Sequence, residues 1–526
     1  MVNLIIHNAN LLSFHQGFKQ GSGDTIAIEG NRIKAIGRWD ELKLLVHANT
    51  TVIDAGGKTI MPGFNDSHIH IWKVGNLKTF MLDVRSAGSL DEMLGMIRDY
   101  HWQNPDVSWI TARGFNEAGW KDGRMPDKND LDKVVSNKPV YVIRTCAHIA
   151  VANTRALEAS NITANTPVPP GGMMYMGADR KPNGVLSETA LGLVSKHIPA
   201  YTKNELKVMV KAARNELYSL GITAATDPAV DPLLLQAYYE MHAADELGFR
   251  LNAIPILLPD GGEMPYALPD CYSSAMFSVN TVKFFSDGGL SGKTAALKRY
   301  YKNTSDLGVL RLQKNQYLQL GTAAMEKGLG LATHAIGDAA IEFVVDCYRH
   351  LDESFPNAIK RIEHLGLPEE KHLEAMAKHN MSASMQTIFI SELGKNFRKY
   401  LDKDYLNRCY PVRSVLAHGI LTALSSDAPV VSNLNPLKGI EAAVTRKDNE
   451  GYAIAPQESI SVAEALKAYT ISAAAIGNAT QYGALYPGQL ADLIILSHDP
   501  LKTAANELSH IKVERTFVDG KCVFEV

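Results

Sequence analysis

The stretch PGFNDSHIH, residues 62–70, contains two histidines one residue apart, His68 and His70. Side chains of a β-strand point alternately to its two faces, so this spacing puts both imidazoles on one face. Imidazole nitrogens are good ligands for a borderline cation such as Zn²⁺. A turn with two polar side chains fits the same nine residues, so the other ligands of a metal must be sought along the chain.

Four more polar residues end apolar runs later in the sequence and are followed by turn or helix-start residues. They are Lys283 in VKFF, His334 in LATH, His364 in RIEH and Asp427 in LSSD. Imidazole nitrogen and carboxylate oxygen both bind catalytic zinc, which keeps one position open for water. Four histidines exceed the needs of one such ion, but two metals joined by a bridging anion would use them all.

Lys283 and Asp427 fit the remaining tasks of such a centre. Burial beside cations favours a neutral lysine amine, and a neutral amine can capture carbon dioxide as a carbamate whose two oxygens bridge the metals. The Asp427 carboxylate can bind one metal and carry a proton to a leaving group. We therefore expect Asp427 to be both a metal ligand and the catalytic residue.

Each of these residues has a simpler explanation when taken alone. A histidine at a strand end is more often structural than a ligand, and a lysine there usually reaches the surface. An aspartate after two serines often caps a helix. Six such coincidences at the ends of successive predicted strands are far less expected together, and together they favour one shared site.

Short apolar strands that alternate with amphipathic helices must position these residues. Strand patterns lie at 221–226, 251–257, 281–286, 330–334, 361–364, 382–386 and 421–426. With the strand that carries His68 they make eight, which predicts an α/β fold with a closed parallel barrel. Catalytic groups of such a barrel lie at the carboxyl ends of its strands, where all six candidates fall. Both termini are rich in short strands, and the region 71–220 is too long for one crossover, which indicates an insertion.

The composition excludes several other classes of protein. With 53 basic and 56 acidic residues the formal net charge is −3, which gives no reason to expect nucleic acid or an anionic membrane as a partner. Five cysteines without CxxC spacing fit a reducing compartment. No apolar run reaches 18 residues, and the first residues lack the basic region of a signal peptide. We therefore expect a cytoplasmic protein.

Ten motifs in a fixed order carry a resemblance to a known family. They are PGFNDSHIH (62–70), GFNEAGW (114–120), PVYVIRTCAHIAVANTRAL (139–157), PNGVLSE (182–188), VKFFSDGGLSG (282–292), THAIGD (333–338), RIEHLG (361–366), SMQ (384–386), SSDAPV (425–430) and YPGQLADLIIL (486–496). In this order the chain resembles the amidohydrolase superfamily, and within it amidohydrolase family 3, the YtcJ-like and N-substituted formamide deformylase-like metal-dependent hydrolases. The match runs nearly end to end.

The resemblance implies a distorted (β/α)8 TIM barrel with a small β-sandwich domain formed by both termini. The expected domains are a discontinuous β-sandwich at 1–56 and 485–526 and a metal-dependent barrel at 57–484, with an inserted subdomain at about 71–220.

The resemblance also implies the roles of the six candidates. His68 and His70 match the strand-1 pair, His334 and His364 match the ligands on strands 5 and 6, and Asp427 matches the acid on strand 8. Lys283 matches the carboxylated lysine of binuclear members. The implied cofactors are one or two divalent metal ions per chain, expected to be zinc, with carbon dioxide as a carbamate on Lys283 in the binuclear case.

A second set of matched residues is implied to bind substrate: His148, Glu117, Trp120, Glu188 and Gln386. Simpler explanations are a structural histidine, a surface glutamate, a core tryptophan, an acid at a helix N-terminus and a polar partner at a strand end. The sequence departs from the family at Ala147, where glycine is more usual before the histidine.

The function implied is hydrolysis of a C–N amide bond, in an N-substituted formamide or another N-acyl amide, by metal-activated hydroxide. The alternatives are a deaminase or cyclic-amide hydrolase acting on a heterocycle at the same site, and a non-catalytic scaffold. Related deaminases tend to lack the lysine that stands here at Lys283, and all six ligand positions are filled, which argues against a scaffold. The expected partner is a small-molecule amide, and a homodimer is the commonest default for soluble oligomers.

Overall fold

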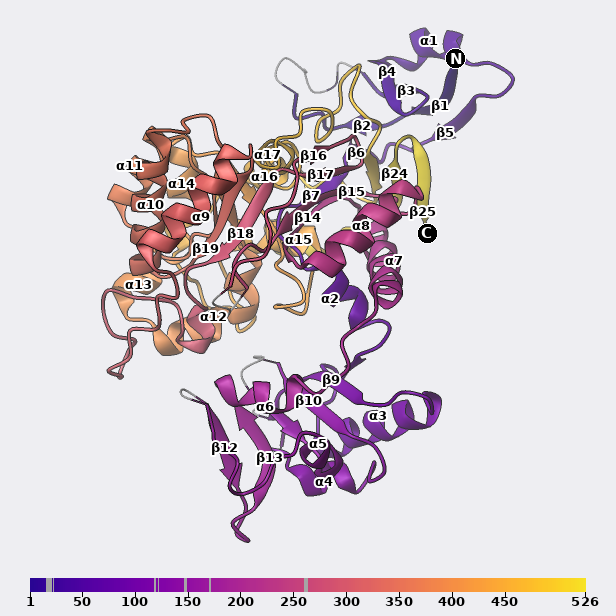
Figure 1. Cartoon of the computed structure of the whole chain (residues 1–526). Helices are drawn as coiled ribbons and strands as arrows, with labels where there is room; N and C mark the ends of the chain where they lie inside the picture. The colour runs from indigo at the N-terminus through magenta and orange to yellow at the C-terminus, as the bar shows by residue number, and fades with distance from the viewer. Residues whose placement is uncertain are drawn as a thin grey trace. The chain divides into compact units, whose positions relative to one another are not determined.

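The computed structural model describes residues 1–15, 21, 23–117, 120–121, 123–145, 149–169, 172–259 and 264–526. The chain forms two compact units, which we call unit 1 (Met1–Ile71 with Arg214–Val526) and unit 2 (Trp72–Ala213). Both units combine strands with helices (Figure 1), so the predicted mixed α/β fold is confirmed. Among the described residues, no helix is long and apolar enough to cross a membrane.

Two five-stranded sheets of unit 1 carry the candidate residues. The first has the order β16-β17-β15-β14-β7 and the second the order β18-β19-β20-β21-β22. Neighbours are parallel except for β16 and β17. The strands are β7 (Phe64–Asp66), β14 (Ile222–Val230), β15 (Arg250–Pro255), β16 (Tyr272–Ser273), β17 (Phe277–Val279), β18 (Thr281–Phe285), β19 (Gly330–Ala335), β20 (Lys360–His364), β21 (Ser382–Met385) and β22 (Thr422–Leu424).

Amphipathic helices separate these strands along the chain. In α10 the apolar residues recur at helical spacing, and Ile341, Val344, Tyr348 and Leu351 are buried. Helices α9, α10 and α11 lie side by side next to β18 and β19 (Figure 1). The helices of this part are α7 (Lys203–Ser219, which begins in unit 2 and ends in unit 1), α8 (Pro232–Ala243), α9 (Lys314–Glu326), α10 (Asp338–Asp352), α11 (Glu370–Lys378), α12 (Ile388–Tyr400), α13 (Lys403–Asn407), α14 (Val412–Ala417), α15 (Pro436–Thr445), α16 (Val462–Ala468) and α17 (Ile471–Ile476).

The strands predicted from the sequence correspond to β14, β15 and β18–β22, with shifted ends. The strand predicted at 221–226 continues to Val230, and the one predicted at 421–426 is ordered as a strand only at Thr422–Leu424. The parallel register aligns neighbouring strands, as where Phe285 of β18 faces His334 of β19. The carboxyl ends of β18, β19 and β20 therefore lie at one edge of the sheet.

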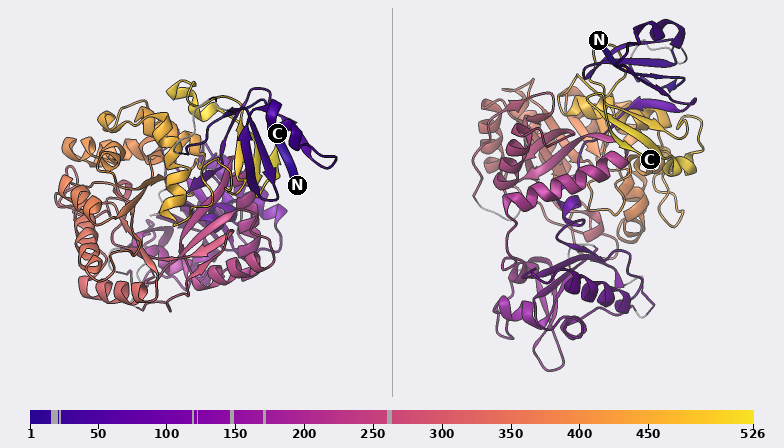
Figure 2. Two further views of the ribbon diagram at one scale, coloured as in Figure 1. Left: turned by 90° about the horizontal axis from the view of Figure 1, so that it is seen from above. Right: turned by 90° about the vertical axis from the view of Figure 1, so that its right-hand side faces the viewer.

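Both termini contribute to two further sheets of unit 1, whose strands lie side by side in both views of Figure 2. Their orders are β4-β3-β1-β5 and β2-β6-β23-β24-β25. One apolar cluster joins them, with Ile6 and Ile28 from the first sheet and Ile60, Leu493 and Phe517 from the second. The strands are β1 (Val2–His7), β2 (Asn10–Leu11), β3 (Thr25–Glu29), β4 (Arg32–Gly37), β5 (Thr51–Asp54), β6 (Thr59–Pro62), β23 (Leu493–Leu496), β24 (Val513–Val518) and β25 (Lys521–Glu525), with helix α1 (Trp39–Leu42) after β4.

Unit 2 is built on one six-stranded sheet with the order β12-β13-β11-β10-β9-β8. Alternate residues of β10 enter two different cores, Val140 and Val142 on one face and Tyr141 on the other. The sheet is therefore buried on both faces. Its elements are β8 (Leu82–Asp83), β9 (Ile110–Phe115), β10 (Val140–Arg144), β11 (Ile149–Ala152), β12 (Met173–Met176), β13 (Pro182–Ser187), α2 (Ile71–Asn76, which begins at the last residue of unit 1), α3 (Leu90–Gln103), α4 (Lys128–Asp132), α5 (Thr154–Ala159) and α6 (Gly192–Ser195).

Candidate metal centre

His68 and His70 follow β7 on a segment that is hydrogen-bonded to the chain beyond β22. Asp427 N donates to His68 O at 2.7 Å, and His70 N donates to Ala428 O at 2.9 Å. Strand β7 itself ends at Asp66. The H-x-H spacing predicted that both imidazoles lie on one regular strand, and this prediction is wrong because both residues follow the strand. Backbone hydrogen bonds beyond the strand end hold this segment in place.

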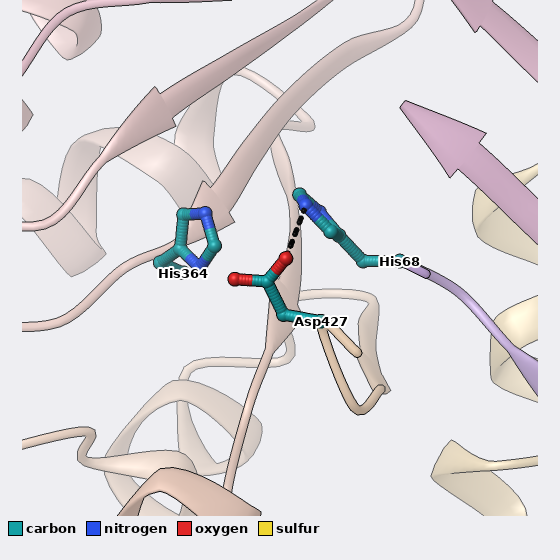
Figure 3. Close-up of side chains that lie close together, drawn as sticks. All are labelled: His68, His364 and Asp427. Carbon is teal, nitrogen blue, oxygen red and sulfur yellow. Dashed lines mark ion pairs between the residues drawn. The ribbon is translucent and has the colours of Figure 1, made fainter. Parts of the chain in front are cut away.

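The predicted ligands converge in the interior of unit 1. His68, His364 and Asp427 are buried, and each offers a ligand atom within 4.8 Å of the others (Figure 3). Nε2 of His68 lies 3.4 Å and Nε2 of His70 lies 3.3 Å from Asp427 Oδ1. The rings of His334 and His364 are 4.4 Å apart, centroid to centroid. The structure thus brings all four histidines and the aspartate together.

Two histidines of this cluster, His68 and His364, are held in their neutral form. Burial lowers the pKa of His68 to about 4, and the nearby cation of Lys283 acts in the same direction. Burial, the neighbouring histidines and Lys283 lower the pKa of His364 well below its usual range. A neutral imidazole with a free lone pair is the form that binds a metal.

Lys283 lies in the same interior and is fully buried on β18. Its Nζ has no hydrogen-bond partner among the described residues and lies 4.9 Å from the centroid of the Phe285 ring. Burial lowers the pKa of Lys283 to about 8, although the carboxylates of Glu363 and Asp427 oppose this shift. A buried amine without a hydrogen-bond partner is costly, so a group bound beside Lys283 would satisfy a need that the described residues leave open.

Two of the predicted ligands adopt a left-handed backbone conformation. The φ angles are +75° at His364, +48° at Leu365 and +56° at Asp427. Non-glycine residues pay on the order of 1–3 kcal/mol for such strain, which clusters at functional sites. At His364 the change comes at the last residue of β20, so its side chain leaves the alternation of that strand.

Polar residues behind the cluster fix its geometry. His364 Nδ1 lies 2.6 Å from Gln386 Oε1, and Gln386 Nε2 donates to Ser425 Oγ at 2.9 Å. Asp66 accepts hydrogen bonds from the backbone N–H groups of His68 at 3.1 Å and Ser426 at 3.2 Å. Burial raises the pKa of Asp66 to about 7. These contacts tie the ends of β7, β20 and β21 to the segment after β22.

Sequence reasoning missed Glu363, whose carboxylate contacts His68 Nδ1. In a regular strand, consecutive residues such as Glu363 and His364 point to opposite faces. The sequence therefore gave no reason to group Glu363 with His364. The available signal was the R-x-E pair of RIEH, because two charged residues on one face of an otherwise apolar strand are rarely buried unless paired.

The donor set fits a divalent cation, since neutral imidazoles and a carboxylate from separate strands meet at one buried point. The model of the amidohydrolase family matches residues 51–524 of the chain. The chain belongs to this family. This amidohydrolase is 28% identical to amidohydrolase YtcJ of Bacillus subtilis strain 168, over 95% of this chain and 96% of that one.

Two further comparisons span almost the whole chain. The amidohydrolase is 27% identical to N-substituted formamide deformylase of Arthrobacter pascens, over 100% of this chain and 99% of the relative. Its fold is similar to that of an uncharacterized metal-dependent hydrolase from Pyrococcus horikoshii OT3, with a TM-score of 0.79, 24% identity and coverage of 95% and 99%. The protein is thus a metal-dependent hydrolase of carbon–nitrogen bonds other than peptide bonds.

The residues predicted to bind substrate have varied environments in this amidohydrolase. Glu117 of unit 2 pairs with Arg144, whose Nε lies 2.8 Å from Glu117 Oε2. Trp120 is 6% exposed in the apolar core of unit 2 and donates from Nε1 to Ala87 O at 3.0 Å. Trp120 has the core position that was its simpler explanation, whereas the side chain of Glu117 is only 13% exposed and is not that of a surface glutamate. For both, contact with substrate stays a prediction.

The other three residues predicted to bind substrate are Gln386, Glu188 and His148. Gln386 uses both ends of its amide inside unit 1, against His364 and Ser425. Glu188 begins a short 3-10 helix, Glu188–Leu191, after β13. His148 lies outside the described residues. For all three, binding of substrate stays a prediction.

Proposed function

We propose that the protein hydrolyses the C–N bond of small N-acyl amides, N-substituted formamides among them. The site of this reaction is the cluster of His68, His70, Lys283, His334, His364 and Asp427. The observation that carries the proposal is the position of Asp427 Oδ1 within 3.4 Å of Nε2 of both His68 and His70. A carboxylate that close to two imidazoles can share a cation with them.

We propose further that the two parallel sheets of unit 1 form a closed eight-stranded barrel in the order β7, β14, β15, β18, β19, β20, β21, β22. Ile256, just after β15, forms a parallel bridge with Lys283 of β18. At the other junction Ser67 Oγ donates to Leu424 O at 3.2 Å. Both contacts support closure, which would place the six residues at one mouth of the barrel.

The ligands proposed for the metal are the four histidines and Asp427, with the Lys283 amine as the group that would carry a bridging carbamate. Zinc suits imidazole and carboxylate donors, and one or two ions fit the number of donors. Such a cation supplies Lewis acidity to an amide carbonyl and lowers the pKa of a water molecule.

Asp427 has the position of the proton carrier in this proposal. Its carboxylate accepts a proton from the attacking water and delivers it to the nitrogen that leaves when the C–N bond breaks. His68 and His364 do not compete for that proton because burial keeps their pKa values low. The buried surroundings also limit the access of bulk water, which strengthens the interaction of Asp427 with a developing ammonium.

The substrate class rests on the full-length likeness to N-substituted formamide deformylase and on the presence of Lys283. The test is a screen of the metal-replete protein against N-substituted formamides, N-acyl amino acids, cyclic amides and aminated heterocycles. Release of formate or another carboxylate from an acyclic amide, absent in Asp427→Asn, supports the proposal. Turnover confined to cyclic amides or to deamination of heterocycles contradicts it.

A further inference from the structure

A buried carboxylate lies directly behind His68, on the side of the ring away from the proposed metal. Glu363 Oε2 is in hydrogen-bond contact with His68 Nδ1. Glu363 is fully buried and His68 is 2% exposed, so no solvent separates or screens the two groups. The other ring nitrogen, Nε2, faces Asp427 Oδ1 at 3.4 Å.

Arg361 holds this carboxylate in place. Its Nε donates to Glu363 Oε1, and its Nη2 donates to Glu363 Oε2 at 3.1 Å. The two residues are two positions apart on β20 and therefore lie on the same face of the strand. Nη2 of Arg361 also donates to Ser67 O, the carbonyl that immediately precedes His68. One guanidinium thus fixes both the carboxylate and the backbone that carries the histidine.

The protonation pattern of this triad follows from its chemistry. An ionised carboxylate only accepts hydrogen bonds, and both oxygens of Glu363 already face donors of Arg361. The proton in the contact with His68 must therefore lie on Nδ1. A neutral imidazole that carries its proton on Nδ1 has its lone pair on Nε2, the nitrogen that faces the proposed metal.

We infer that Glu363, held by Arg361, is a positioning residue that fixes the tautomer and ring orientation of His68 for metal binding. The inference rests on the proposed function, because it needs the metal centre. It goes beyond that proposal by assigning a role to two residues outside the ligand set. Carboxylate partners of this kind orient a ligand histidine and raise its basicity.

The other histidines of the cluster have different neighbours. His364 Nδ1 faces a neutral amide oxygen, that of Gln386 at 2.6 Å. His70 Nδ1 lies 4.0 Å from Asp227 Oδ1, beyond hydrogen-bond distance. His334 also has a carboxylate nearby, since Asp287 Oδ1 lies 3.3 Å from its Nε2. What distinguishes His68 is that an arginine, Arg361, holds its carboxylate partner in place.

The sharpest variant is Glu363→Gln, which keeps the size of the side chain. Both oxygens of Glu363 face Arg361 donors, so the new NH₂ group meets an Arg361 donor in either orientation, and it also meets His68 Nδ1 when it takes the place of Oε2. In the other orientation His68 keeps an oxygen acceptor but loses the charge of its partner. When it faces His68, it donates to Nδ1 and forces the ring proton onto Nε2, which removes the lone pair from the metal side. We expect the Zn²⁺ affinity of the apoprotein to fall about 10–100-fold, measured by competition with a chromogenic chelator.

A matched control comes from a second buried Arg–carboxylate pair in unit 1. Arg250 and Asp492 are each 2–3% exposed, and Arg250 Nη2 donates to Asp492 Oδ1 at 2.8 Å. This pair joins β15 to the segment before β23, and the other side-chain hydrogen bonds of Arg250 go to Ala275 and Asp519 rather than to a proposed ligand. Asp492→Asn therefore breaks a comparable ion pair, and its Zn²⁺ affinity should stay at the wild-type value even if its melting temperature falls.

Glu363→Asp provides a second measurement of Zn²⁺ affinity, which does not require that Glu363→Gln folds. It keeps the charge beside Arg361 but withdraws the carboxylate from His68 by one methylene group. Its Zn²⁺ affinity should lie between those of the wild type and Glu363→Gln. In the Co²⁺-loaded protein, the visible absorption of Glu363→Gln should change, because that spectrum reports the ligands of the cobalt ion.

The outcomes separate this inference from the proposed function. Wild-type affinity in Glu363→Gln, or in Glu363→Asp if only that variant folds, overturns the positioning role. An equal loss in Asp492→Asn also overturns it, because the effect would then be general destabilisation. His68→Ala is the reference for the proposed centre: if that variant binds Zn²⁺ as the wild type does, the proposed function itself fails.

Discussion

The strand ends of unit 1 and the sheet of unit 2 bury very different side chains. Unit 2 fills both faces of its sheet with apolar residues, such as Val142 on one face and Leu186 on the other. Its buried Asp130 is matched by Arg124 at 2.7 Å and completes a capping box with Asp127, the N-cap of helix α4. Unit 1 instead buries Lys283 with no hydrogen-bond partner for Nζ among the described residues and gathers His68, His70 and His364 around Asp427.

This difference indicates what each interior is for. Removing an ionised group from water costs several kcal/mol unless a partner compensates, and unit 2 shows that the chain can build a core that meets this condition. The polar interior of unit 1 lowers stability unless something else binds there. We therefore interpret unit 2 as a folded core in its own right and the strand ends of unit 1 as a site for a bound cation.

The largest expected effect is on kcat, and it should separate Asp427 of unit 1 from Asp130 of unit 2. Asp427→Asn should fold normally and lose at least about 10²-fold in kcat, the scale of a proton-transfer contribution. Asp130→Asn in unit 2 should lose stability and keep its kcat per folded molecule. Steady-state kinetics and thermal melts of both variants check this, and near-normal turnover in Asp427→Asn would remove that residue from the mechanism.

The second prediction concerns the metal content of a variant at Lys283. If two metals are joined by a carbamate on this lysine, Lys283→Ala should lower the metal-to-protein ratio, because the bridging oxygens are lost. Elemental analysis of the purified variant beside the wild type measures it. An unchanged ratio would rule out the bridging role, while Lys314→Ala, at an exposed lysine paired with Asp346, serves as a control.

A substitution in the core of unit 2 should change the stability of the protein but not its metal content. Leu131 is fully buried there, so Leu131→Ala should lower the free energy of unfolding by about 2–5 kcal/mol through the lost transfer energy and the cavity. The metal content of the folded fraction should not change, since all proposed ligands lie in unit 1. Urea titration and elemental analysis test the two halves of this statement.

The smallest effect concerns the acid sensitivity of unit 2. Burial opposes ionisation of Asp130, yet hydrogen bonds from Arg124 and the Asp127 backbone lower its pKa to about 2. The stability this gives is fully present above the unfolded pKa of about 3.9 and is lost as the pH falls through the folded value. Asp130→Asn should thus be less stable than the wild type at pH 6, with the gap closing as the pH falls from about 4 towards 2. A constant gap would contradict the assignment.

Much of the site could be predicted because polar residues that end apolar runs are unusual. His334 and His364 end β19 and β20 nearly where the pattern placed them, and Asp427 follows β22. Periodicity predicted the strands, and the parallel register brought their ends to one edge.

What could not be predicted depends on contacts between distant segments or on irregular backbone. Glu363 was missed because the left-handed conformation of His364 brings consecutive residues of β20 to the same site. The end of β7 before His68 depends on hydrogen bonds to a segment more than 350 residues away, such as Asp427 N to His68 O. The mixed sheet of unit 2 left no clear pattern, because both of its faces are buried and its strands are short.

The central claim is that hydrolysis needs a divalent metal held by this cluster. The most direct measurement is elemental analysis of the purified protein together with amide hydrolysis before and after chelation, for the wild type and His364→Ala. The account predicts one or two divalent ions per wild-type chain, activity that is lost on chelation and returns with Zn²⁺, and depleted metal in His364→Ala. Full activity in the metal-free protein, or wild-type metal content in His364→Ala, would contradict it.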